Sequence, residues 1–520
     1  MRRAGTFFSS IAVVACVTTA MAMPPLPARS TLLASDAVAY DAAATTLAID
    51  GARLVFGARG REEGGINRGA VYVFGSSASG WSQLQKVTPL LAIDREEFGA
   101  ALALRGNLLA VGAPKSDRDA DDAGSAWVYE SNGVSFVEAT RLASPQPVAN
   151  GAYGSAVAVL TGSTPRVVVG AEREHVGVVE AGRVHVYARV SGAWTLEASL
   201  DPGGVPTEND EFGHAVAASD DRIAVGSPGD DSSGVNAGAV YIFVRVGAAW
   251  SLETMLVSPT PESLGEFGAA LALDGDALVV AAYREDGGAM DAGRAHVYMR
   301  GATGWQLVQS LLAPSPSSTA EFGRSVDLRD GVIAIGACRA AGLAPTSGAA
   351  FLFRRFATGN WSCVATVCSP EGQTSEFSGT AVGVSQLKLA FGAPLRSQPA
   401  AYQGAVFVAD LAGDCNGDLT PDAMEIVLGA ADCNANNLPD ACDIALGEPD
   451  IEGNGIPDSC EVIQCLADLS GNNIVNATDI ALFLSVWGTD GTKLDADFDG
   501  DGFVGAADLA FLLSGWGDCP

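Results

Sequence analysis

The chain has 520 residues, of which 48% are hydrophobic and 62 are glycine. This length allows two to four domains, and this apolar content excludes a wholly disordered chain. The formal net charge is −31. Because no basic stripe with interleaved aromatic residues offsets this charge, the composition argues against nucleic-acid binding and favours cations as partners. Ala, Val and Gly dominate, which suits short strands and tight turns and predicts a mainly β fold.

Residues 1–22 have the layout of a secretory signal peptide. Arg2 and Arg3 precede an apolar run, and Ala20-Met21-Ala22 precedes the expected cleavage site. We therefore expect a secreted or cell-surface protein. An alternative is a lipoprotein signal that ends at Cys16. No other apolar run reaches the length of a transmembrane helix.

A repeat of about 55 residues organises residues 30–412. The stretch EFGAALALRGNLLAVGAP, from Glu97, returns in related form from Glu211, Glu266, Glu321 and Glu376, with weaker copies at Ala43 and Ala152. With the residue after the aromatic position as register, the seven units are marked by Ala44, Gly99, Gly154, Gly213, Gly268, Gly323 and Ser378.

Each unit contains short alternating runs bounded by Gly, Asp or Asn, which predict a four-stranded antiparallel sheet. One such sheet leaves its faces uncovered, so seven of them are expected to stack radially as a seven-bladed β-propeller. The seventh unit ends near Leu411 without a fourth strand. We predict that STLLASD, from Ser30 to Asp36, supplies this strand and closes the ring.

The two signatures of the repeat are most complete at Phe98-Gly99 and Gly112-Ala113-Pro114. They resemble the FG-GAP repeats of the integrin α-subunit propeller and of many exported bacterial proteins. Integrin-type repeats often hold calcium in a DxDxDG loop. The corresponding loops here read KSDRDADDAG, GDDSSGVNAG and REDGGAMDAG, and they lack this alternation of oxygen ligands. We therefore interpret their Asp and Asn residues as turn caps.

The propeller region has no recognisable catalytic motif. His185 and His296 occupy a repeat position that is aromatic in the other units, and His175 and His214 lie in or beside loops without a repeated partner. We predict a protein that is not an enzyme. The alternative is an exported carbohydrate-active enzyme, a polysaccharide hydrolase or lyase with a propeller catalytic domain.

Residues 413–520 contain 21 Asp plus Glu against one basic residue, Lys493. EF-hand-type loops bind Ca²⁺ through oxygens at positions 1, 3, 5, 7 and 12, with Gly or Asn favoured at position 6. Two segments fit this spacing. Their predicted ligands are Asp468, Ser470, Asn472, Ile474 and Asp479 in the first loop, and Asp497, Asp499, Asp501, Phe503 and Asp508 in the second.

An amphipathic run follows each of these two loops and predicts a short helix. The duplicated loop and helix, within residues 465–520, resemble a dockerin, a calcium-folded module that docks onto cohesin domains. The resemblance implies a cohesin-like or other cell-surface partner. Positions 10 and 11, which often carry partner selectivity in dockerins, are Ala477-Thr478 and Ala506-Ala507. The second pair differs from the familiar hydroxyl pairs of that family.

Residues 413–461 continue the same spacing with a period of 18 residues, and Leu419 at position 6 departs from the Gly or Asn rule in the first loop. The predicted ligands are Asp414, Asn416, Asp418, Asp422 and Glu425; Asp432, Asn434, Asn436, Asp440 and Asp443; and Asp450, Glu452, Asn454, Asp458 and Glu461. This segment resembles the thrombospondin type 3 repeats, which implies calcium and disulfides in place of a core. One of 15 possible pairings of the six cysteines joins Cys415 to Cys433, Cys442 to Cys460 and Cys465 to Cys519. The alternative is a solvated acidic linker.

Three functions follow as hypotheses. The first is a secreted binding or scaffold protein, in which the propeller presents a surface to a protein or glycan and the calcium-bound tail attaches it. The second is the carbohydrate-active enzyme, and the third is a structural component of the cell envelope. Clustered carboxylates at one end of the propeller channel would favour the enzyme, whereas an exposed aromatic or apolar patch would favour the binding protein.

Overall fold

The structure is a computed structural model, and it describes residues 26–27, 30–77, 80–91, 93–176, 180–203, 207–355, 359–385, 388–397, 400–410, 430–433, 439–446, 450, 455–457, 467–472, 474–490, 494, 496–498 and 501–518. The predicted signal peptide and the alternative lipoprotein site at Cys16 lie outside these residues. The chain divides into two compact units, residues 1–412 and 413–520, and each is treated by itself below.

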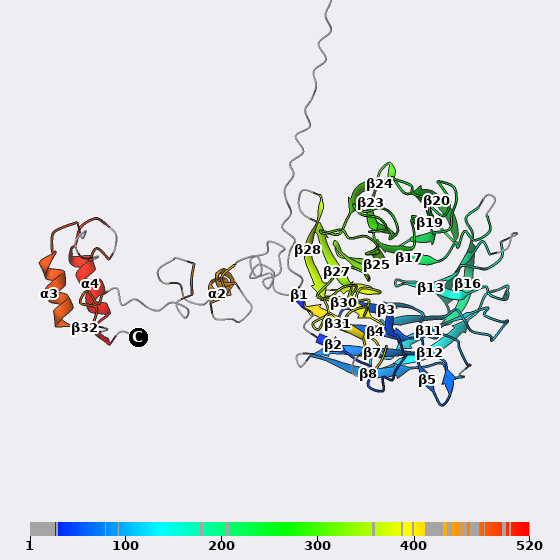
Figure 1. The fold of residues 1–520 in the computed structure, drawn as a ribbon, viewed down its shortest axis with the longest axis horizontal. Helices are drawn as coiled ribbons and strands as arrows, with labels where there is room; N and C mark the ends of the chain where they lie inside the picture. The colour runs from blue at the N-terminus through cyan, green and yellow to red at the C-terminus, as the bar shows by residue number, and fades with distance from the viewer. Residues whose placement is uncertain are drawn as a thin grey trace, which may run out of the picture. The chain divides into compact units, whose positions relative to one another are not determined.

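The first unit is a β-propeller of seven sheets arranged in a ring (Figure 1). The strands that the blades share are paired antiparallel, and the first strand of each blade lines a central channel. Blades one to three contain β3 (Ala43–Asp50), β4 (Arg53–Ala58), β7 (Ala70–Ser77) and β8 (Gly80–Val87); β9 (Ala101–Arg105), β10 (Leu108–Ala113), β11 (Ser125–Ser131) and β12 (Phe136–Leu142); and β13 (Tyr153–Leu160), β14 (Arg166–Ala171), β15 (Arg183–Val190) and β16 (Ala193–Leu200).

The remaining four blades follow the same order. They contain β17 (Ala215–Ser219), β18 (Arg222–Ser227), β19 (Ala239–Val246) and β20 (Ala249–Val257); β21 (Ala270–Asp274), β22 (Ala277–Ala282), β23 (Arg294–Gly301) and β24 (Gly304–Leu311); β25 (Phe322–Arg329), β26 (Val332–Ala337), β27 (Ala349–Arg355) and β28 (Trp361–Cys368); and β29 (Val382–Ser385), β30 (Lys388–Ala393) and β31 (Ala405–Asp410). A small hairpin of β5 (Glu62–Glu63) and β6 (Ile66–Asn67) projects from the first blade. The predicted seven-bladed propeller is confirmed.

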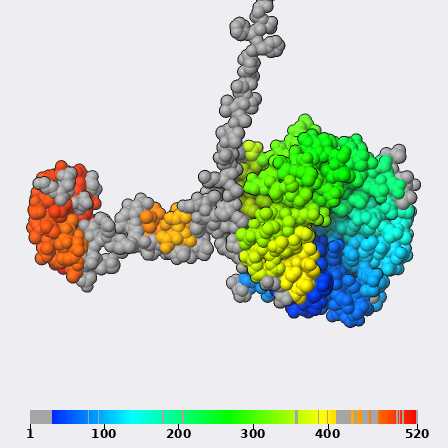
Figure 2. All heavy atoms as spheres, in the orientation of Figure 1, coloured from blue at the N-terminus to red at the C-terminus, as the bar shows by residue number. Residues whose placement is uncertain are grey.

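The N-terminal strand closes the ring, as the sequence predicts. β2 (Ser30–Leu32) pairs antiparallel with β31, with Thr31 opposite Phe407, and supplies the fourth strand of the seventh blade. In Figure 2 the blue first blade lies beside the yellow seventh blade. The sequence did not predict β1 (Leu26–Pro27), which pairs in parallel with β28 and adds a fifth strand to the sixth blade.

The FG and GAP signatures are two sides of one contact between neighbouring blades. Gly112 of the GAP signature lies against the backbone of Gly154, so a Cβ on Gly112 would approach the Gly154 carbonyl oxygen to 2.0 Å. Gly154 itself has a φ of +92°, which favours glycine. The preceding aromatic is fully buried, as Phe98 and Tyr153 are. The two signatures therefore recur because the backbones of neighbouring blades pack closely at these glycines.

The seventh unit corrects the predicted register by one residue. Gly379 has a φ of +86°, and its N–H donates to the Gly392 carbonyl at 2.9 Å, as Gly99 donates to Gly112 at 3.0 Å. Ser378 therefore fills the aromatic position instead of the glycine position. Phe377 takes the left-handed backbone position that Glu97 holds in the second blade, with φ values of +58° and +55°.

In the second unit, two short helices pack around an aromatic core. α3 (Ala477–Ser485) and α4 (Ala506–Ser514) follow the two predicted loops, and β32 (Ile474–Val475) pairs with β33 (Gly517–Asp518). Phe498 stacks on Phe483 and on Phe511, with ring centroids 6.2 and 5.0 Å apart. Both predicted helices are therefore present. α2 (Asp440–Leu446) lies upstream and was not predicted.

Candidate functional site

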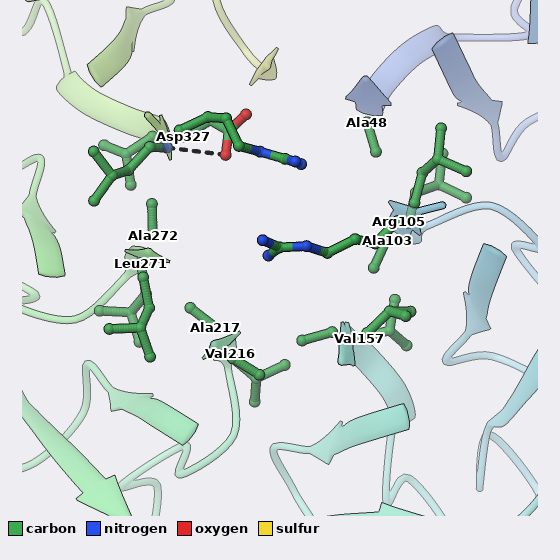
Figure 3. Close-up of a pocket in the computed structure, with 18 of the residues that line it drawn as sticks. Ala48, Ala103, Arg105, Val157, Val216, Ala217, Leu271, Ala272 and Asp327 are labelled. Atoms are coloured by element: carbon green, nitrogen blue, oxygen red, sulfur yellow. Dashed lines mark hydrogen bonds between the residues drawn. The ribbon is translucent and has the colours of Figure 1, made fainter. Parts of the chain in front are cut away.

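The propeller channel contains a cavity of about 220 Å³ whose walls come from the inner strands of the seven blades. The walls are mostly apolar, and Figure 3 shows the Arg105 side chain extending into the space between these walls. This end of the channel is the end at which the inner strands finish.

Opposite charges meet across this end. Arg329 donates to Asp50 at 3.0 Å, and Arg105 lies 3.9 Å from Asp274. Asp327 accepts backbone hydrogen bonds from Leu328 and Val384, at 2.9 and 2.8 Å. Burial nevertheless raises the pKa of Asp327 above its ordinary value. Charged side chains from blades one, two, five and six thus lie at this end of the channel.

The opposite mouth, where the inner strands begin, carries a ring of glutamates with cationic partners. Glu97, Glu211, Glu266 and Glu321 occupy one repeat position, immediately before the buried aromatic. Glu97 lies 3.8 Å from Arg59, Glu266 lies 3.2 Å from Arg284, and Glu321 lies 3.0 Å from Arg339. These carboxylates are therefore charge-compensated on the surface of the mouth.

Glu211 differs from the other three because its partner is a histidine that a second carboxylate also reaches. His214 Nδ1 lies 2.7 Å from Glu172 and 3.7 Å from Glu211. Burial acts to lower the pKa of His214, but the hydrogen bond to Glu172 and the charges of both glutamates raise it overall. Burial raises the pKa of Glu211, whereas the hydrogen bond and charge of His214 outweigh burial and lower that of Glu172. His214 was noted from the sequence, but Glu172 was not. The signal that could have identified Glu172 is the absence, at this position, of the Pro that completes the GAP signature.

His185 and His296 occupy the aromatic position of their blades, as predicted, and each is buried with a glutamate. His185 Nε2 lies 3.0 Å from Glu174, and His296 Nε2 lies 3.0 Å from Glu285. The other ring nitrogens meet Ser199 and Ser310, both at 2.9 Å. Since the two sites are equivalent and closed to solvent, they are elements of the fold.

The three loops considered for calcium in the propeller share one turn. The N–H groups of Asp122, Asn236 and Asp291 donate to the side chains of Asp117, Asp231 and Asp286, at 2.7, 2.7 and 2.9 Å. Each first aspartate thus caps a residue five positions later. This geometry agrees with the interpretation of these residues as turn caps.

The described residues among the predicted ligands of the loop at Asp468 lie around one buried carboxylate. Asp479 is 0% exposed and accepts from the N–H groups of Ser470 and Asn476, at 2.9 and 2.8 Å. Ser470 Oγ donates to Asp468 at 2.9 Å. The N–H groups of Asn472 and Ile474 donate to Asp468 and Asn472. The polar groups of this loop therefore lie close together at the start of α3.

The second loop repeats this arrangement at the start of α4. Asp508 is 1% exposed and accepts from the N–H groups of Phe498 and Gly505, at 2.7 and 2.8 Å. Asp497 Oδ2 accepts from Gly502, and Asp501 accepts from Phe503. Asp497 Oδ1 is buried and has no hydrogen-bond partner. Asp499 lies outside the described residues.

Most predicted ligands between residues 413 and 461 lie outside the described part of the chain. Asp440 and Asp443 are buried in α2, and the Cys433 N–H donates to Asp440 at 2.8 Å. The Gly455 N–H donates to Asp450 at 3.1 Å. Asp432 is also described. The others outside are Asp414, Asn416, Asp418, Asp422, Glu425, Asn434, Asn436, Glu452, Asn454, Asp458 and Glu461.

The described cysteines fall into two groups. Cys338, Cys363 and Cys368 of the sixth blade carry free thiols, whereas Cys433 and Cys442 of the second unit are disulfide-bonded. The pairing of the six C-terminal cysteines stays a prediction, because Cys415, Cys460, Cys465 and Cys519 lie outside the described residues.

The fold and its inter-blade contacts define a seven-bladed β-propeller protein. Its segments 28–74, 81–129, 194–243, 250–298 and 305–353 match the family model described as FG-GAP repeat. These five segments of the propeller are therefore similar to FG-GAP repeats. Within the residues that the structure describes, no helix is both long and apolar enough to cross a membrane.

A similar solved chain comes from the crystal structure of the mitotic checkpoint complex. It is 12% identical, the match covers 78% of this chain and 98% of that chain, and the TM-score is 0.44. No curated protein matches the chain.

Proposed function

We propose that this is a secreted or cell-surface calcium-binding protein whose propeller binds a protein or glycan and whose C-terminal unit attaches it to a partner. The observation that carries the binding role is an exposed aromatic pair on a closed FG-GAP propeller. Tyr40 and Tyr402 are 69% and 45% exposed, and their rings lie 5.7 Å apart. Both lie in loops at the mouth where the inner strands begin.

Other exposed apolar side chains support this face as the binding surface. Leu264, Met290 and Leu343 lie in loops at the same end of the blades, and each is more than half exposed. Exposed aromatic and apolar groups beside paired charges suit the recognition of a protein or a sugar ring.

The test measures ligand binding with tyrosine variants. The Tyr40→Ala/Tyr402→Ala protein and the unaltered protein are applied to a glycan array and to immobilised extracellular matrix proteins. We expect the double variant to lose at least tenfold in affinity for whichever ligand the unaltered protein binds. A matched control is Val134→Ala/Val246→Ala, because these side chains are exposed at 86% and 69% in hairpins at the other end. Equal losses in both variants would contradict the proposal.

Calcium binding is proposed for the second unit, and the donor set fits a hard cation. The described ligands are oxygen atoms only, which is what Ca²⁺ prefers. The buried and unpartnered Asp497 Oδ1 is a group that a cation would satisfy. Ca²⁺ would offset the mutual repulsion of the carboxylates in each loop. The residues that would hold it are Asp468, Ser470, Asn472, Ile474 and Asp479 in one loop and Asp497, Asp499, Asp501, Phe503 and Asp508 in the other. The same role is proposed for the loops at Asp414, Asp432 and Asp450.

Calorimetry of the full chain tests the calcium proposal. We expect two unfolding transitions, and we expect a chelator to lower only the one that belongs to the second unit. Asp508→Asn should weaken the calcium dependence, whereas Asp490→Asn, at an exposed position outside the predicted ligand set, should not. A thermogram that is unchanged by chelation would contradict calcium binding.

Attachment is proposed through the exposed face of α3 and α4. Leu484, Trp487, Phe511, Leu513 and Trp516 are each at least 43% exposed. A dockerin-like unit would use such a surface for a cohesin-like or other cell-surface partner. Immobilised cohesin domains should retain the full chain in calcium and release it in chelator. Trp487→Ala/Trp516→Ala should abolish retention. No retention by any cohesin would leave a different surface protein as the expected partner class.

The enzyme remains the second hypothesis, because carboxylates cluster at the mouth. We rank it lower because Glu97, Glu266 and Glu321 each form an ion pair with an arginine. A pair of glycosidase carboxylates would instead need one member with a raised pKa to donate a proton. Polysaccharide turnover that is lost on substituting Glu172 or Glu211 would favour the enzyme.

A further inference from the structure

Two residues that break the repeat meet at the mouth of the propeller. At the position of Glu172, the other six blades hold Arg59, Pro114, Pro228, Tyr283, Cys338 and Pro394. At the position of His214, they hold Thr45, Ala100, Ser155, Ala269, Arg324 and Thr380. Since the fold forms six times without this glutamate and this histidine, it does not require either of them. Their meeting therefore points to a function.

The local backbone fixes the three side chains against one another. Glu172 follows β14 of the third blade, and His214 immediately precedes β17 of the fourth. Glu211 lies three residues before His214 in a tight turn, in which the His214 N–H donates to the Glu211 carbonyl at 3.0 Å. Glu211 has a φ of +54°, and the buried Phe212 between them anchors the turn.

One ligand atom from each of Glu172, Glu211 and His214 lies within 4.8 Å of the other two. Around tetrahedral Zn²⁺, with metal–ligand distances of about 2.1 Å, such atoms are roughly 3.4 Å apart. Side-chain rotations that move the ligand atoms by about 1 Å are therefore sufficient to form the site. The side chains are 18%, 33% and 38% exposed, so an ion can enter from solvent.

We propose that Glu172, Glu211 and His214 form a zinc-binding site at the mouth of the propeller. Two carboxylates and one imidazole are a suitable donor set for Zn²⁺, and the nitrogen ligand disfavours Ca²⁺. Three protein ligands leave a fourth position open. His214 also lines a cavity of about 280 Å³ at this mouth. The open position therefore has room for water or for a group of a bound ligand. The site is independent of the calcium loops in the second unit.

The repeat supplies substitutions that should preserve the fold. His214→Thr introduces the residue found at this position in blades one and seven, and Glu172→Pro introduces the residue found in blades two, four and seven. Glu97→Gln and His175→Gln are controls. Glu97 holds the repeat position of Glu211 but is paired with Arg59, and His175 is an exposed histidine of a nearby loop.

The experiment titrates Zn²⁺ into the full chain by calorimetry, at millimolar calcium to occupy the C-terminal loops, and follows Co²⁺ substitution by visible absorption. We expect one site per chain in the unaltered protein and in both controls. Glu172→Pro/His214→Thr should abolish this site and its cobalt absorption while keeping the melting temperature of the metal-free protein. His214→Thr alone should weaken binding at least tenfold. Absence of a zinc site in the unaltered protein, or its retention in the double variant, would overturn the proposal.

Discussion

Single buried positions in the propeller change together from blade to blade. In the fifth blade, Glu285 and His296 are fully buried, and Arg294 lies 3.8 Å from Glu285. The third blade repeats this arrangement with Glu174, His185 and Arg183. In the sixth blade the equivalent residues are Ala340, Phe351 and Ala349, which are all buried. In these three blades the glutamate and its histidine and arginine partners are therefore present together or absent together, as the cost of an unpaired buried charge requires.

This pattern predicts a non-additive effect on stability. Glu285→Ala should destabilise the propeller by about 2–4 kcal/mol, because it leaves His296 and Arg294 without their carboxylate. The triple variant Glu285→Ala/His296→Phe/Arg294→Ala reproduces the sixth blade and should recover most of this loss. Urea unfolding monitored by fluorescence measures both. A triple variant that is less stable than the single variant would contradict this explanation.

The three free thiols of the sixth blade should be unreactive in the folded protein. Burial raises the pKa of Cys338, Cys363 and Cys368 to about 12 in each case, and the thiolate is the reactive form. Iodoacetamide at pH 8 should therefore leave all three unmodified and should label them after unfolding in guanidinium chloride. Peptide mass spectrometry identifies the sites. Rapid labelling of any of the three in the native protein would show that this blade opens.

At the scale of the element, neighbouring blades are joined by glutamates on outer strands. Glu197 of β16 accepts from Arg166 of its own blade and from Arg245 and Trp250 of the next blade. Glu253 of β20 repeats this with Arg222, Arg300 and Trp305. Each carboxylate thus connects two sheets at their periphery. Arginine forks and an indole N–H are strong donors to such a group.

The contacts of Glu197 and Glu253 between neighbouring blades predict a loss of stability in acid. Burial acts to raise the pKa of Glu197 and of Glu253, but the hydrogen bonds from arginine and tryptophan lower both below the ordinary value of 4.5. A lowered folded-state pKa adds stability above about pH 4.5, and this stability is lost as the pH falls through the folded-state pKa. The melting temperature of the propeller should therefore drop more between pH 5 and pH 3 in the unaltered protein than in Glu197→Gln/Glu253→Gln. Parallel curves would contradict this role.

At the scale of the whole molecule, the ring depends on one short N-terminal strand. β2 has only three residues, yet it completes the seventh blade, and Leu32 is 4% exposed within the core between the first and seventh blades. Asp36, just after it, binds Arg61, Lys86 and Tyr72 of the first blade. The N-terminal segment therefore holds together the two blades at which the ring closes.

Removal of this strand should weaken the whole propeller. A chain that begins at Leu33 loses the burial of Leu32 and the pairing with β31, which we estimate at about 3 kcal/mol or more. Its propeller transition in calorimetry should fall by several degrees. A chain that begins at Ser30 keeps β2 and serves as the control. Equal melting of the two truncated chains would show that the ring closes without β2.

Much of the fold was predictable because its rules are local and repeated. Alternating strands, the buried aromatic and the close approach of Gly112 to Gly154 recur in nearly every unit, so the repeat showed seven blades and the closing strand. The register of the seventh blade was wrong by one residue, because EFSG places its aromatic one position early and only the backbone hydrogen bond of Gly379 reveals this. α2 was missed because its spacing was interpreted only as a calcium loop.

The sequence by itself determined the number of blades, the strand that closes the ring, the two C-terminal helices and a calcium-type spacing that stays a prediction. These features depend on neighbours along the chain or on a fixed period. The tertiary structure alone decided which side chains meet across blades. Glu172 and His214 are 42 residues apart, and Arg105 and Asp274 come from blades two and five. Such contacts arise from the curvature of the ring, which brings distant inner strands together around one channel, and no local pattern in the sequence records them.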